Sequence, residues 1–285
     1  MIRQATYGDL LKIQDFIGEH WRKDHVLTKD LALFNHLYSF PGSNSLNFLL
    51  YEDNNGQLVG VLGYIQASQY DNKIPSSADI IWYSIWKSID SKTNNLLGLL
   101  LMTELSKRFK AIQRGTVGAD LSTLPVYKAL RYKTGTLSTF YAVNPKKKEL
   151  NILRNINKTS DRLDALSDNS CIIKSIDCFE ELEAAAAWVN AFAKSHYLFK
   201  TFGYIQNKYI NHPRFKYNFW EISSFTSRLI IISRKVNWNA SSLIRIVDFV
   251  GDKCLFKGFT DKLRKIVIGS SEYIEFRCSG LSSEL

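Results

Sequence analysis

A polar turn between a strand and a helix is the first stretch of this chain whose residues could do chemistry. It reads SIWKSIDSKTNNLLGLLLMTEL, from Ser84 to Leu105, with one glycine, Gly98, near the start of the helix. The free N–H groups of a first helical turn, with the helix dipole behind them, form a site for an anion such as a phosphate. The same pattern is typical of an ordinary joint between a strand and a helix, so the rest of the chain must decide between these interpretations.

The bulk composition predicts a folded protein with room for one large domain or two smaller ones. The chain has 285 residues, of which 45% are hydrophobic and 13% aromatic. No stretch approaches about 18 consecutive apolar residues, and the N-terminus lacks the apolar block of a signal peptide. We therefore expect a cytoplasmic protein without a membrane span.

The charge of the chain predicts an anionic partner. Its formal net charge is +10, which suits nucleic acid, a membrane surface, or small phosphorylated ligands such as nucleotides and coenzyme A. The basic residues are scattered, and we interpret their one tight run, Lys146 to Lys148, as a solvated linker. Nothing resembles a DNA-reading helix or an RNA-stacking signature, so we expect no nucleic-acid partner.

The cysteines and histidines do not predict a metal site. The four cysteines lack CxxC spacing, and the five histidines show neither HExxH nor HxH spacing. We expect buried free thiols and no metal.

Hydrophobic periodicity predicts two successive regions that mix strands and helices. The first begins with a strand at 2–5 and a helix, continues with a second helix from Thr28, and contains a hairpin around Asp53–Gly56. It closes with a strand that ends near Asn144. A polar stretch at 146–168 is interpreted as a linker. The predicted domains are therefore 1–145 and 169–285.

The first region resembles the GNAT (Gcn5-related) N-acyltransferases. The resemblance rests on the start IRxATxxDLxxIxxF, on the strand, loop and helix described above, and on LSTLPVYKALRY, which is similar to the family segment N-x-x-A-x-x-x-Y-x-x-x-G-F. It implies an α/β (α+β) fold: a GNAT-type mixed sheet flanked by helices, with the C-terminal domain as a candidate for the same fold. The family loop R/Q-x-x-G-x-G/A would fall on residues 93–98 and keeps only its last glycine, Gly98.

A narrower resemblance concerns a two-domain GNAT subgroup from bacterial O-antigen and capsule clusters. It rests on EHWRKDHVLTKDLALFNHLY, KSHYLFKTFGYIQNKYINHPRFKYNF and LIRIVDFVG. It implies transfer of an acetyl or 3-hydroxybutyryl group from coenzyme A to a nucleotide-linked amino sugar, such as a dTDP-3-amino-3,6-dideoxyhexose, for lipopolysaccharide synthesis. The amine would attack the thioester directly.

The family resemblance assigns the residues that would hold acyl-CoA. The loop and helix start would bind its pyrophosphate, and the strand before them would pair with its pantetheine and donate a backbone N–H to the oxyanion. The residues of the loop and helix start are Asn94, Asn95, Leu96, Leu97 and Gly98. The residues of the strand are Trp86, Lys87, Ser88 and Ile89.

Three residues are candidates for the chemical step. Tyr127 matches the family tyrosine that protonates the leaving thiolate, although it could equally pack the short helix. His25 and Asp30 lie on the segment that borders the acceptor site in the GNAT fold, and either could accept the proton of the amine. His25 could instead be a structural hydrogen-bonding residue, and Asp30 could complement a helix dipole.

A nucleotide sugar needs an aromatic wall, cations for the diphosphate and polar groups for the sugar. We expect a few members of an aromatic and basic set to supply these contacts, while most of the rings pack in the core. The set is Trp82, Tyr204, Tyr209, His212, Arg214, Arg245 and Asp248. Because Arg245 and Asp248 are three apart on a predicted strand, we expect them to face opposite sides.

Two other functions compete with this interpretation. The same fold could acylate another amine, on an aminoacyl group, a polyamine or a protein. Alternatively, the chain could be a non-catalytic module that binds coenzyme A or a nucleotide. The aromatic segment near Trp220 would permit a homodimer.

Overall fold

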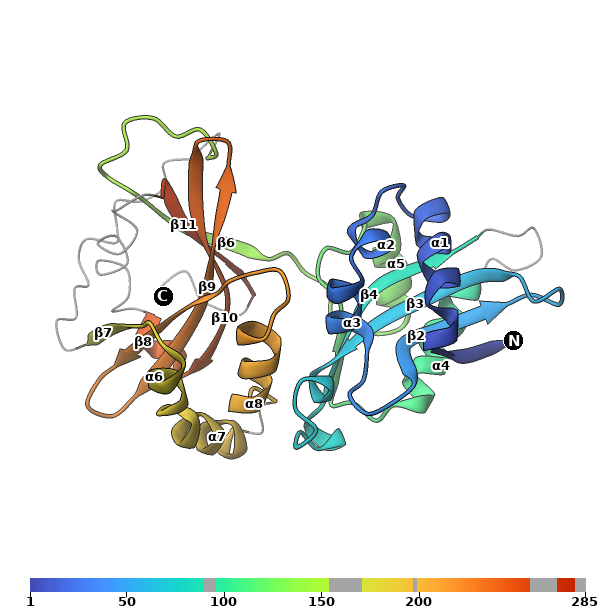
Figure 1. The fold of residues 1–285 in the computed structure, drawn as a ribbon, viewed down its shortest axis with the longest axis horizontal. Coiled ribbons are helices and arrows are strands. Elements are labelled where there is room, and N and C mark those ends of the chain that lie inside the picture. Colours follow the sequence, from blue (N-terminus) through green and yellow to red (C-terminus); the bar gives the residue numbers. More distant parts are fainter. Residues whose placement is uncertain (90–95, 154–170, 197–198, 257–270, 280–285) are drawn as a thin grey trace. The chain divides into compact units, whose positions relative to one another are not determined.

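The computed structural model describes residues 1–89, 96–153, 171–196, 199–256 and 271–279 (Figure 1). The chain divides into two compact units. Unit 1 contains residues 1–134 and 193–214, and unit 2 contains residues 135–192 and 215–285.

Unit 1 is built on a five-stranded sheet in the order β1-β2-β3-β4-β5, which we call sheet 1. Its strands are β1 (Ile2–Thr6), β2 (Ser45–Glu52), β3 (Leu58–Gln66), β4 (Ile80–Ser88) and β5 (Gln113–Gly115). Its helices are α1 (Leu10–His20), α2 (Val26–Lys29), α3 (Leu31–Tyr38), α4 (Leu97–Arg108), α5 (Leu124–Ala129) and α8 (Phe202–Ile205). Neighbouring strands are antiparallel except β4 and β5, which are parallel.

The predicted hairpin at Asp53–Gly56 is confirmed, because this turn joins β2 to β3. The Asp53 carboxylate accepts hydrogen bonds from the N–H groups of Asn55 and Gln57, both at 2.9 Å. Gly56 has a φ of 75°, a left-handed conformation that glycine adopts without steric cost. The second predicted helix differs from the observed one: α3 begins after Asp30, which caps it, and not after Thr28.

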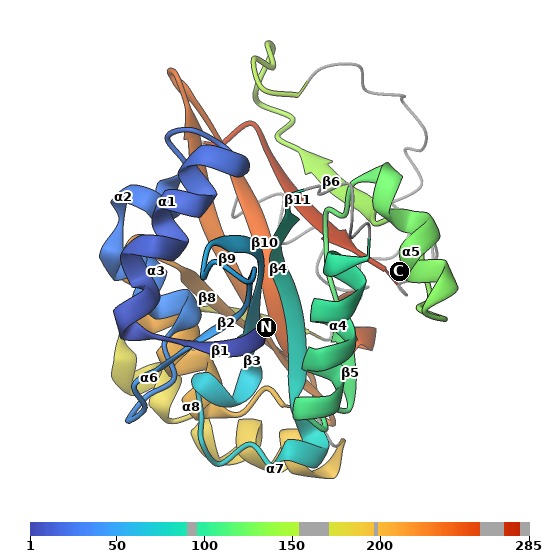
Figure 2. The ribbon, with the colours of Figure 1, turned by 90° about the vertical axis from the view of Figure 1, so that its right-hand side faces the viewer.

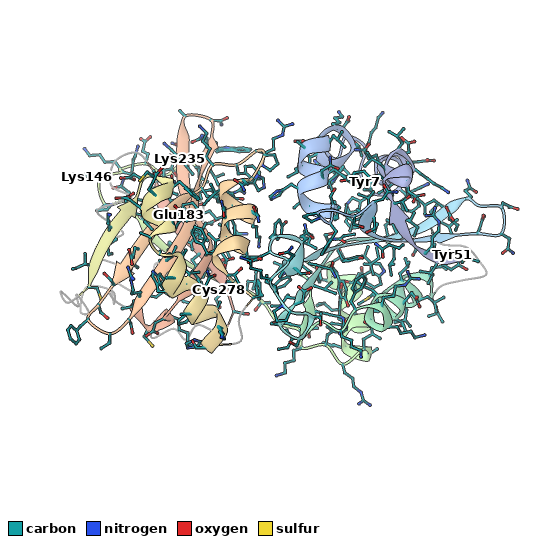
Figure 3. The ribbon with its side chains drawn as sticks, turned by 60° about the horizontal axis from the view of Figure 1, so that its bottom comes forward. Tyr7, Tyr51, Lys146, Glu183, Lys235 and Cys278 are labelled. Carbon is teal, nitrogen blue, oxygen red and sulfur yellow. The ribbon has the colours of Figure 1, made fainter. Side chains whose placement is uncertain are left out.

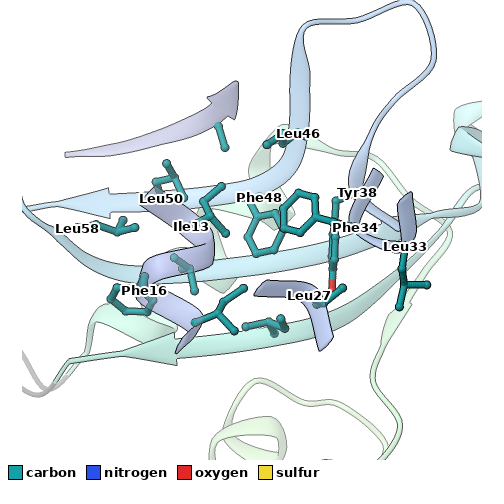
Figure 4. Close-up of a cluster of buried hydrophobic side chains, with 14 residues drawn as sticks. Ile13, Phe16, Leu27, Leu33, Phe34, Tyr38, Leu46, Phe48, Leu50 and Leu58 are labelled. Atoms are coloured by element: carbon teal, nitrogen blue, oxygen red, sulfur yellow. The ribbon is translucent and has the colours of Figure 1, made fainter. Parts of the chain in front are cut away.

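The helices of unit 1 cover both faces of sheet 1 (Figure 2). On one face, α1, α2 and α3 pack over β2, β3 and β4 in a cluster that includes Phe34 and Phe48, both fully buried (Figure 4). Their rings stack with centroids 5.7 Å apart. On the other face, α4 and α5 contribute Leu101 and Tyr127 to a second cluster. Sheet 1 therefore has a buried core on each side.

Unit 2 is built on a six-stranded sheet in the order β6-β11-β10-β9-β8-β7, which we call sheet 2. Its strands are β6 (Ser138–Val143), β7 (Ile172–Ile176), β8 (Asn218–Ser223), β9 (Arg228–Trp238), β10 (Ser241–Gly251) and β11 (Tyr273–Cys278). Its helices are α6 (Phe179–Glu183) and α7 (Ala186–Ser195), the last of which runs into the part assigned to unit 1. Its core contains Leu229, Ile231, Ile246 and Phe276.

Sheet 2 repeats the topology of sheet 1. Strands β7 to β10 are sequential and antiparallel, and β11 is parallel to β10, as β5 is parallel to β4. Strand β6 adds to the far side of β11. No repeat is visible in the letters of the sequence, so the duplication is a feature of the fold.

Two segments lie elsewhere than the sequence predicts. Strand β6, expected as the last strand of the first domain, pairs along its whole length with β11. Residues 193–214, expected in the C-terminal domain, make their contacts within unit 1. Both differences come from pairings between residues far apart in the chain, which local periodicity does not encode. Most of the expected linker, residues 154–168, lies outside the described residues, and its start contacts Glu272 through the N–H groups of Asn151 and Ile152.

Two further sets of expectations concern single residues. Of the cysteines, Cys171 is buried, but Cys178 and Cys254 are exposed, so the expectation of buried thiols is wrong for these two. No helix within the described ranges is long and apolar enough to cross a membrane. Nor do those ranges contain a group of three or more histidine, cysteine, aspartate or glutamate residues that could hold a metal ion.

Candidate functional site

The candidate site in unit 1 lies along the part of β4 that does not pair with β5. β4 pairs with β5 only through Ile80, Ile81 and Trp82. The chain then turns away after Gly115, and the Thr116 hydroxyl donates to the Tyr83 carbonyl at 3.0 Å. Within the described residues, no strand lies beside residues 84–88 of β4 on this side. This half of β4 therefore presents an open strand edge inside the fold.

A β-bulge in β4 changes which side chains face each core. Tyr64 pairs with Tyr83 and Leu62 pairs with Trp86, so Gly63 alone stands opposite both Ser84 and Ile85. Because of this extra residue, Ile85 joins the core under α1–α3, whereas Trp86 packs against the core under α4 and α5.

The bulge is packed tightly from the α3 side. A Cβ on Gly63 would lie 2.7 Å from the Phe48 ring, so the close approach requires glycine. Ser84 accepts a hydrogen bond from the Tyr38 hydroxyl at 3.0 Å. Tyr38 is fully buried, and burial raises the pKa of its phenol to about 12. The backbone at the start of the open edge is thus held in one position.

Two backbone N–H groups face the open side of β4. The Ile89 N–H donates to the Val59 carbonyl at 2.8 Å, so it points toward β3. Because alternate residues of a strand point their N–H groups to the same side, Lys87 also points toward β3, and Trp86 and Ser88 point to the open edge. Of the four residues predicted on this strand, Trp86 and Ser88 are therefore the ones whose amides are available to a ligand.

Helix α4 begins beside this edge, with Trp86 against its first turn. The indole N–H of Trp86 donates to the Gly98 carbonyl at 3.1 Å. A Cβ on Gly98 would lie 2.7 Å from the indole, so this position requires glycine. Leu96 occupies the N-cap position, and it has no side-chain oxygen to cap the helix. Asn94 and Asn95 lie outside the described residues, whereas Leu97 is buried in the first turn.

Tyr127, on α5, lies in a cluster of aromatic side chains on the same side of the sheet. Its ring packs edge-on against Trp86, with centroids 5.8 Å apart, and against Tyr132, at 5.6 Å. The hydroxyls of Tyr83 and Tyr132 bond to each other at 2.7 Å. In the part of the chain that the structure describes, the Tyr127 hydroxyl makes no side-chain hydrogen bond. Burial, with Tyr132 nearby, raises the pKa of Tyr127, which keeps this phenol protonated.

His25 and Asp30 cap the two short helices on the opposite face. His25 Nδ1 accepts from the Leu27 N–H at 3.3 Å, and burial, with the positive charge of Arg22, lowers the pKa of the imidazole. Asp30 accepts from the Leu33 N–H at 2.9 Å and pairs with the Arg214 guanidinium. Its pKa is lowered mainly by Arg214, so this carboxylate is ionised at neutral pH.

The segment 193–214 brings further predicted residues into unit 1. His212 packs its ring edge-on against His36 of α3, with centroids 4.5 Å apart. Arg214 comes from the same segment and reaches Asp30. Tyr204 and Tyr209 are buried, with the Lys208 ammonium over both rings at 4.8 and 5.1 Å. These two tyrosines are packed in the interior, whereas His212 is half-buried and Arg214 exposed.

His36 is a titratable residue of this cluster that the sequence did not single out. Desolvation and the neighbouring His212 lower the pKa of His36 to about 4. Its position on the helical repeat of α3 gave no signal, because only the fold brings residues 36 and 212 together. Trp82, the remaining predicted residue of unit 1, is half-buried on β4 next to Gly115.

Arg245 and Asp248 lie on β10 of unit 2, and the expectation that they face opposite sides is wrong. Ile246 pairs with Ser233 and Asp248 pairs with Ile232, so β10 carries an extra residue at Val247. This bulge shifts the alternation by one and returns Asp248 to the face of Arg245. Arg245 Nε lies 2.5 Å from Oε1 of Glu275, which is almost fully buried on β11.

Comparison with known proteins identifies the fold. No protein-family model matches the sequence, and no curated protein matches it. Among solved structures, a GCN5-related N-acetyltransferase from Anabaena variabilis matches with a TM-score of 0.60 and 9% identity, over 100% of this chain and 67% of its own. A probable N-acyltransferase from Enterococcus faecalis matches with a TM-score of 0.56 and 9% identity, over 97% of this chain and 65% of its own.

A third structure is a GCN5-related glucosamine N-acetyltransferase region of a fungal multi-domain β-N-acetylglucosaminidase. It matches with a TM-score of 0.51 and 10% identity, over 99% of this chain and 35% of its own. This chain thus spans about two thirds of the length of the two bacterial proteins and about a third of the fungal one. The expected GNAT-type fold is confirmed, and the matches extend over both units.

Proposed function

We propose that this chain is an acyl-CoA-dependent N-acyltransferase whose acceptor is a nucleotide-linked amino sugar. The observation that carries the proposal is the open edge of β4 beside the start of α4, with the Tyr127 hydroxyl on the same side. An extended ligand can hydrogen-bond to such an edge as an additional strand, and a pyrophosphate suits a helix N-terminus. Acyl-CoA contains both groups and supplies the thioester.

Different residues of unit 1 would bind the oxyanion and protonate the leaving thiolate. The Trp86 and Ser88 amides would bind the extended ligand and the oxyanion that forms when the amine attacks the thioester carbonyl. The Tyr127 phenol would give its proton to the departing thiolate. No covalent intermediate with the protein is needed.

His25 and Asp30 are the proposed acceptors of the amine's proton. The lowered pKa values leave His25 neutral and Asp30 ionised at neutral pH, and these are the forms in which each can accept a proton. Replacement by asparagine removes the titratable group, yet an asparagine side chain can still cap a helix. In His25→Asn and Asp30→Asn, a role in proton transfer would alter the pH dependence of kcat, whereas a capping role alone would leave it unchanged.

The acetyl or 3-hydroxybutyryl donor and the dTDP-linked 3-amino-3,6-dideoxyhexose acceptor are the finer parts of the proposal. The positive charge of the chain and the arginines of both units suit a diphosphate. The fungal glucosamine N-acetyltransferase region has the same fold, so the fold is compatible with an amino-sugar acceptor. Lipopolysaccharide synthesis in the cytoplasm and a homodimeric state belong to the same proposal.

The test is release of free thiol from acetyl-CoA or 3-hydroxybutyryl-CoA with a panel of dTDP- and UDP-linked amino sugars. Release with one dTDP-amino sugar alone would support the whole proposal. Release only with a polyamine, aminoacyl or peptide amine would keep the reaction and change the acceptor. If no amine gives release and coenzyme A causes no thermal shift, the enzyme proposal is wrong.

Two tyrosine variants test the proposed proton donor. Tyr127→Phe should lower kcat about 100-fold with little change in stability, because it removes the phenolic proton. Tyr132→Phe is the matched control, since it removes a hydroxyl from the same aromatic cluster and, among the described residues, breaks only the hydrogen bond to Tyr83. Equal kcat values for both variants would exclude Tyr127 as the donor.

A further inference from the structure

Sheet 2 carries two arginines side by side on one face. Arg234 on β9 stands directly opposite Arg245 on β10, and directly paired residues of antiparallel strands project to the same face. Glu275 on β11 stands beside Arg245 in the next strand. We call this row of residues 234, 245 and 275 the arginine row.

The two arginines differ in their partners. Arg245 is held by the buried carboxylate of Glu275, whose other oxygen lies 3.5 Å from Nη2 of Arg277. Arg234 has no such carboxylate in the part of the chain that the structure describes, and its buried Nε has no hydrogen-bond acceptor there. The positive charge of Arg234 beside that of Arg245 is unfavourable, and so is a buried N–H without a hydrogen-bond acceptor. A bound anion would relieve both.

Aromatic residues hold Arg234 in place. Its guanidinium lies over the ring of Phe215, 4.3 Å from the centroid. Tyr217 is half-buried near the same guanidinium, and Phe215 is 43% exposed. A stacked guanidinium keeps its N–H fork in a fixed plane, which is the geometry that recognises the oxygens of a phosphate. An exposed ring beside that fork can also pack against a flat base.

We propose that the arginine row of unit 2 binds the phosphoryl groups of a nucleotide, with Arg234 as the principal ligand and Phe215 beside the base. The proposal deepens the proposed function, on which it rests for the choice of a nucleotide-linked acceptor. Asp248 on β10 stands opposite Ile232, which is two residues from Arg234 on β9, so Asp248 lies on the same face of sheet 2. Its negative charge would exclude a phosphate there. The anion is thereby placed toward Tyr217 and Phe215.

Arg228 is a built-in control. It lies six residues before Arg234 on β9, and hence on the same face. Its guanidinium also covers an aromatic ring, that of Trp188, at 5.1 Å. Unlike Arg234, it is paired with a carboxylate, because its Nη2 lies 2.5 Å from Oε1 of Glu221. The two arginines thus share strand, face and stacking, and they differ in whether an acceptor is present.

The experiment is calorimetric titration of the full chain with dTDP, pyrophosphate, thymidine and coenzyme A, each alone. We expect dTDP and pyrophosphate to bind and thymidine to bind far more weakly. Arg234→Gln should weaken dTDP binding about 10- to 100-fold, because a charge-assisted bidentate contact is lost. Arg234→Lys should give an intermediate loss, and Arg228→Gln should stay within about twofold of wild type.

The outcomes separate the sources of the phosphoryl group. If Arg234→Gln weakens coenzyme A as much as dTDP, the site belongs to the acyl donor and the nucleotide assignment is overturned. Binding of pyrophosphate without any gain from the thymidine moiety would overturn the role of Phe215. The proposal would be overturned altogether if dTDP did not bind, or if the folded Arg234→Gln variant bound dTDP as tightly as wild type.

The same measurements do not depend on acyl transfer. Thiol release from acetyl-CoA with a simple amine that carries no phosphate tests the proposed function of unit 1, and we expect Arg234→Gln to leave it unchanged. If the wild-type chain binds dTDP but does not release thiol, the enzyme proposal is wrong and the chain is a nucleotide-binding protein. The converse result would keep the enzyme and remove the arginine row as its acceptor site.

Discussion

Strands β7 to β11 of sheet 2 repeat the order of the five strands of sheet 1, and both sheets have a bulge at the same place, but different side chains surround it. When the strand registers of the two sheets are compared, Trp86 of β4 and Phe249 of β10 occupy equivalent positions, and each follows the bulge of its strand. Trp86 contacts the first turn of α4 and the ring of Tyr127. The ring of Phe249 packs against the rings of Phe256 and Phe276, with centroid distances of 5.0 and 6.0 Å.

The difference separates a side suited to chemistry from a side suited to packing. In unit 1, the aromatic residues next to the bulge carry hydroxyl and indole N–H groups, and they lie beside an open strand edge. In unit 2, phenylalanines occupy the corresponding space, and the charged residues lie on the opposite face of the sheet, in the arginine row. The two units therefore share a topology but carry different side chains, and function depends on the side chains at a site and not on the fold.

The largest expected effect comes from breaking the phenylalanine cluster of unit 2. Phe249→Ala should lower the free energy of unfolding by about 3 kcal/mol, because it removes a large, partly buried ring that packs against two other rings. Urea denaturation measures the change. The interpretation of this cluster as packing would be wrong if Phe249→Ala kept its stability but lost acyl transfer.

Next in size is the contrast between the two arginines of the arginine row. Arg245→Met should cost about 2 kcal/mol, since it leaves the buried Glu275 carboxylate without its nearest cation. Arg234→Met should be neutral or slightly stabilising, because it removes an N–H that has no acceptor in the described structure. Thermal unfolding of both variants would show the opposite order if Arg234 were the structural residue.

Acid should weaken unit 1 through the ion cluster that ties β1 to β2. Arg3 and Lys12 lower the pKa of Glu52 to about 2, below its value of about 4.3 in an unfolded chain. The stabilisation is therefore complete above pH of about 4.3 and is lost as pH falls toward about 2. Hydrogen exchange of β1 and β2 amides should rise in this range in wild type, and the rise should be smaller in Glu52→Gln, which lacks the titrating group.

The smallest effect concerns the end of α5, the helix that carries Tyr127. Arg131 stands where the family segment has glycine, and its φ of 61° is left-handed. Arg131→Gly should raise stability by about 1 kcal/mol, because glycine adopts this conformation without steric cost. Lys128→Gly, inside α5, should lower stability by up to about 1 kcal/mol. A stability gain in both variants would contradict this explanation.

Much of the fold could be predicted from the sequence, because its signals are local. The Asp53–Gly56 hairpin, the long apolar strand before the polar turn and the short helix around Tyr127 all form where turn residues and periodicity place them. The apolar runs RLIIISRKVN and SLIRIVDFVGD also predict a pair of strands, which the structure shows as β9 and β10. The segment FTDKLRKIVIG, residues 259–269, also predicts a helix, but it lies outside the described residues.

The site could be predicted only in part, because one inserted residue changes the direction of every side chain after it. No local pattern indicates the bulge at Val247, and the prediction that Arg245 and Asp248 face opposite sides is therefore wrong. Arg234 and Lys235, the second of which is labelled in Figure 3, are chemically similar neighbours, and no local pattern distinguishes the residue that faces Arg245. His36 was not predicted for a different reason, because only the fold brings it next to His212.

Most secondary-structure elements, the charge and the family resemblance could be predicted, since these depend on residue types and short spacings. Which distant segments meet depends on the tertiary structure. Asp30 and Arg214 are 184 positions apart, and β6 joins a strand that begins at residue 273. Such contacts form because apolar faces and strand edges must be covered, and many segments satisfy that demand locally, so only the packing of the whole chain selects among them.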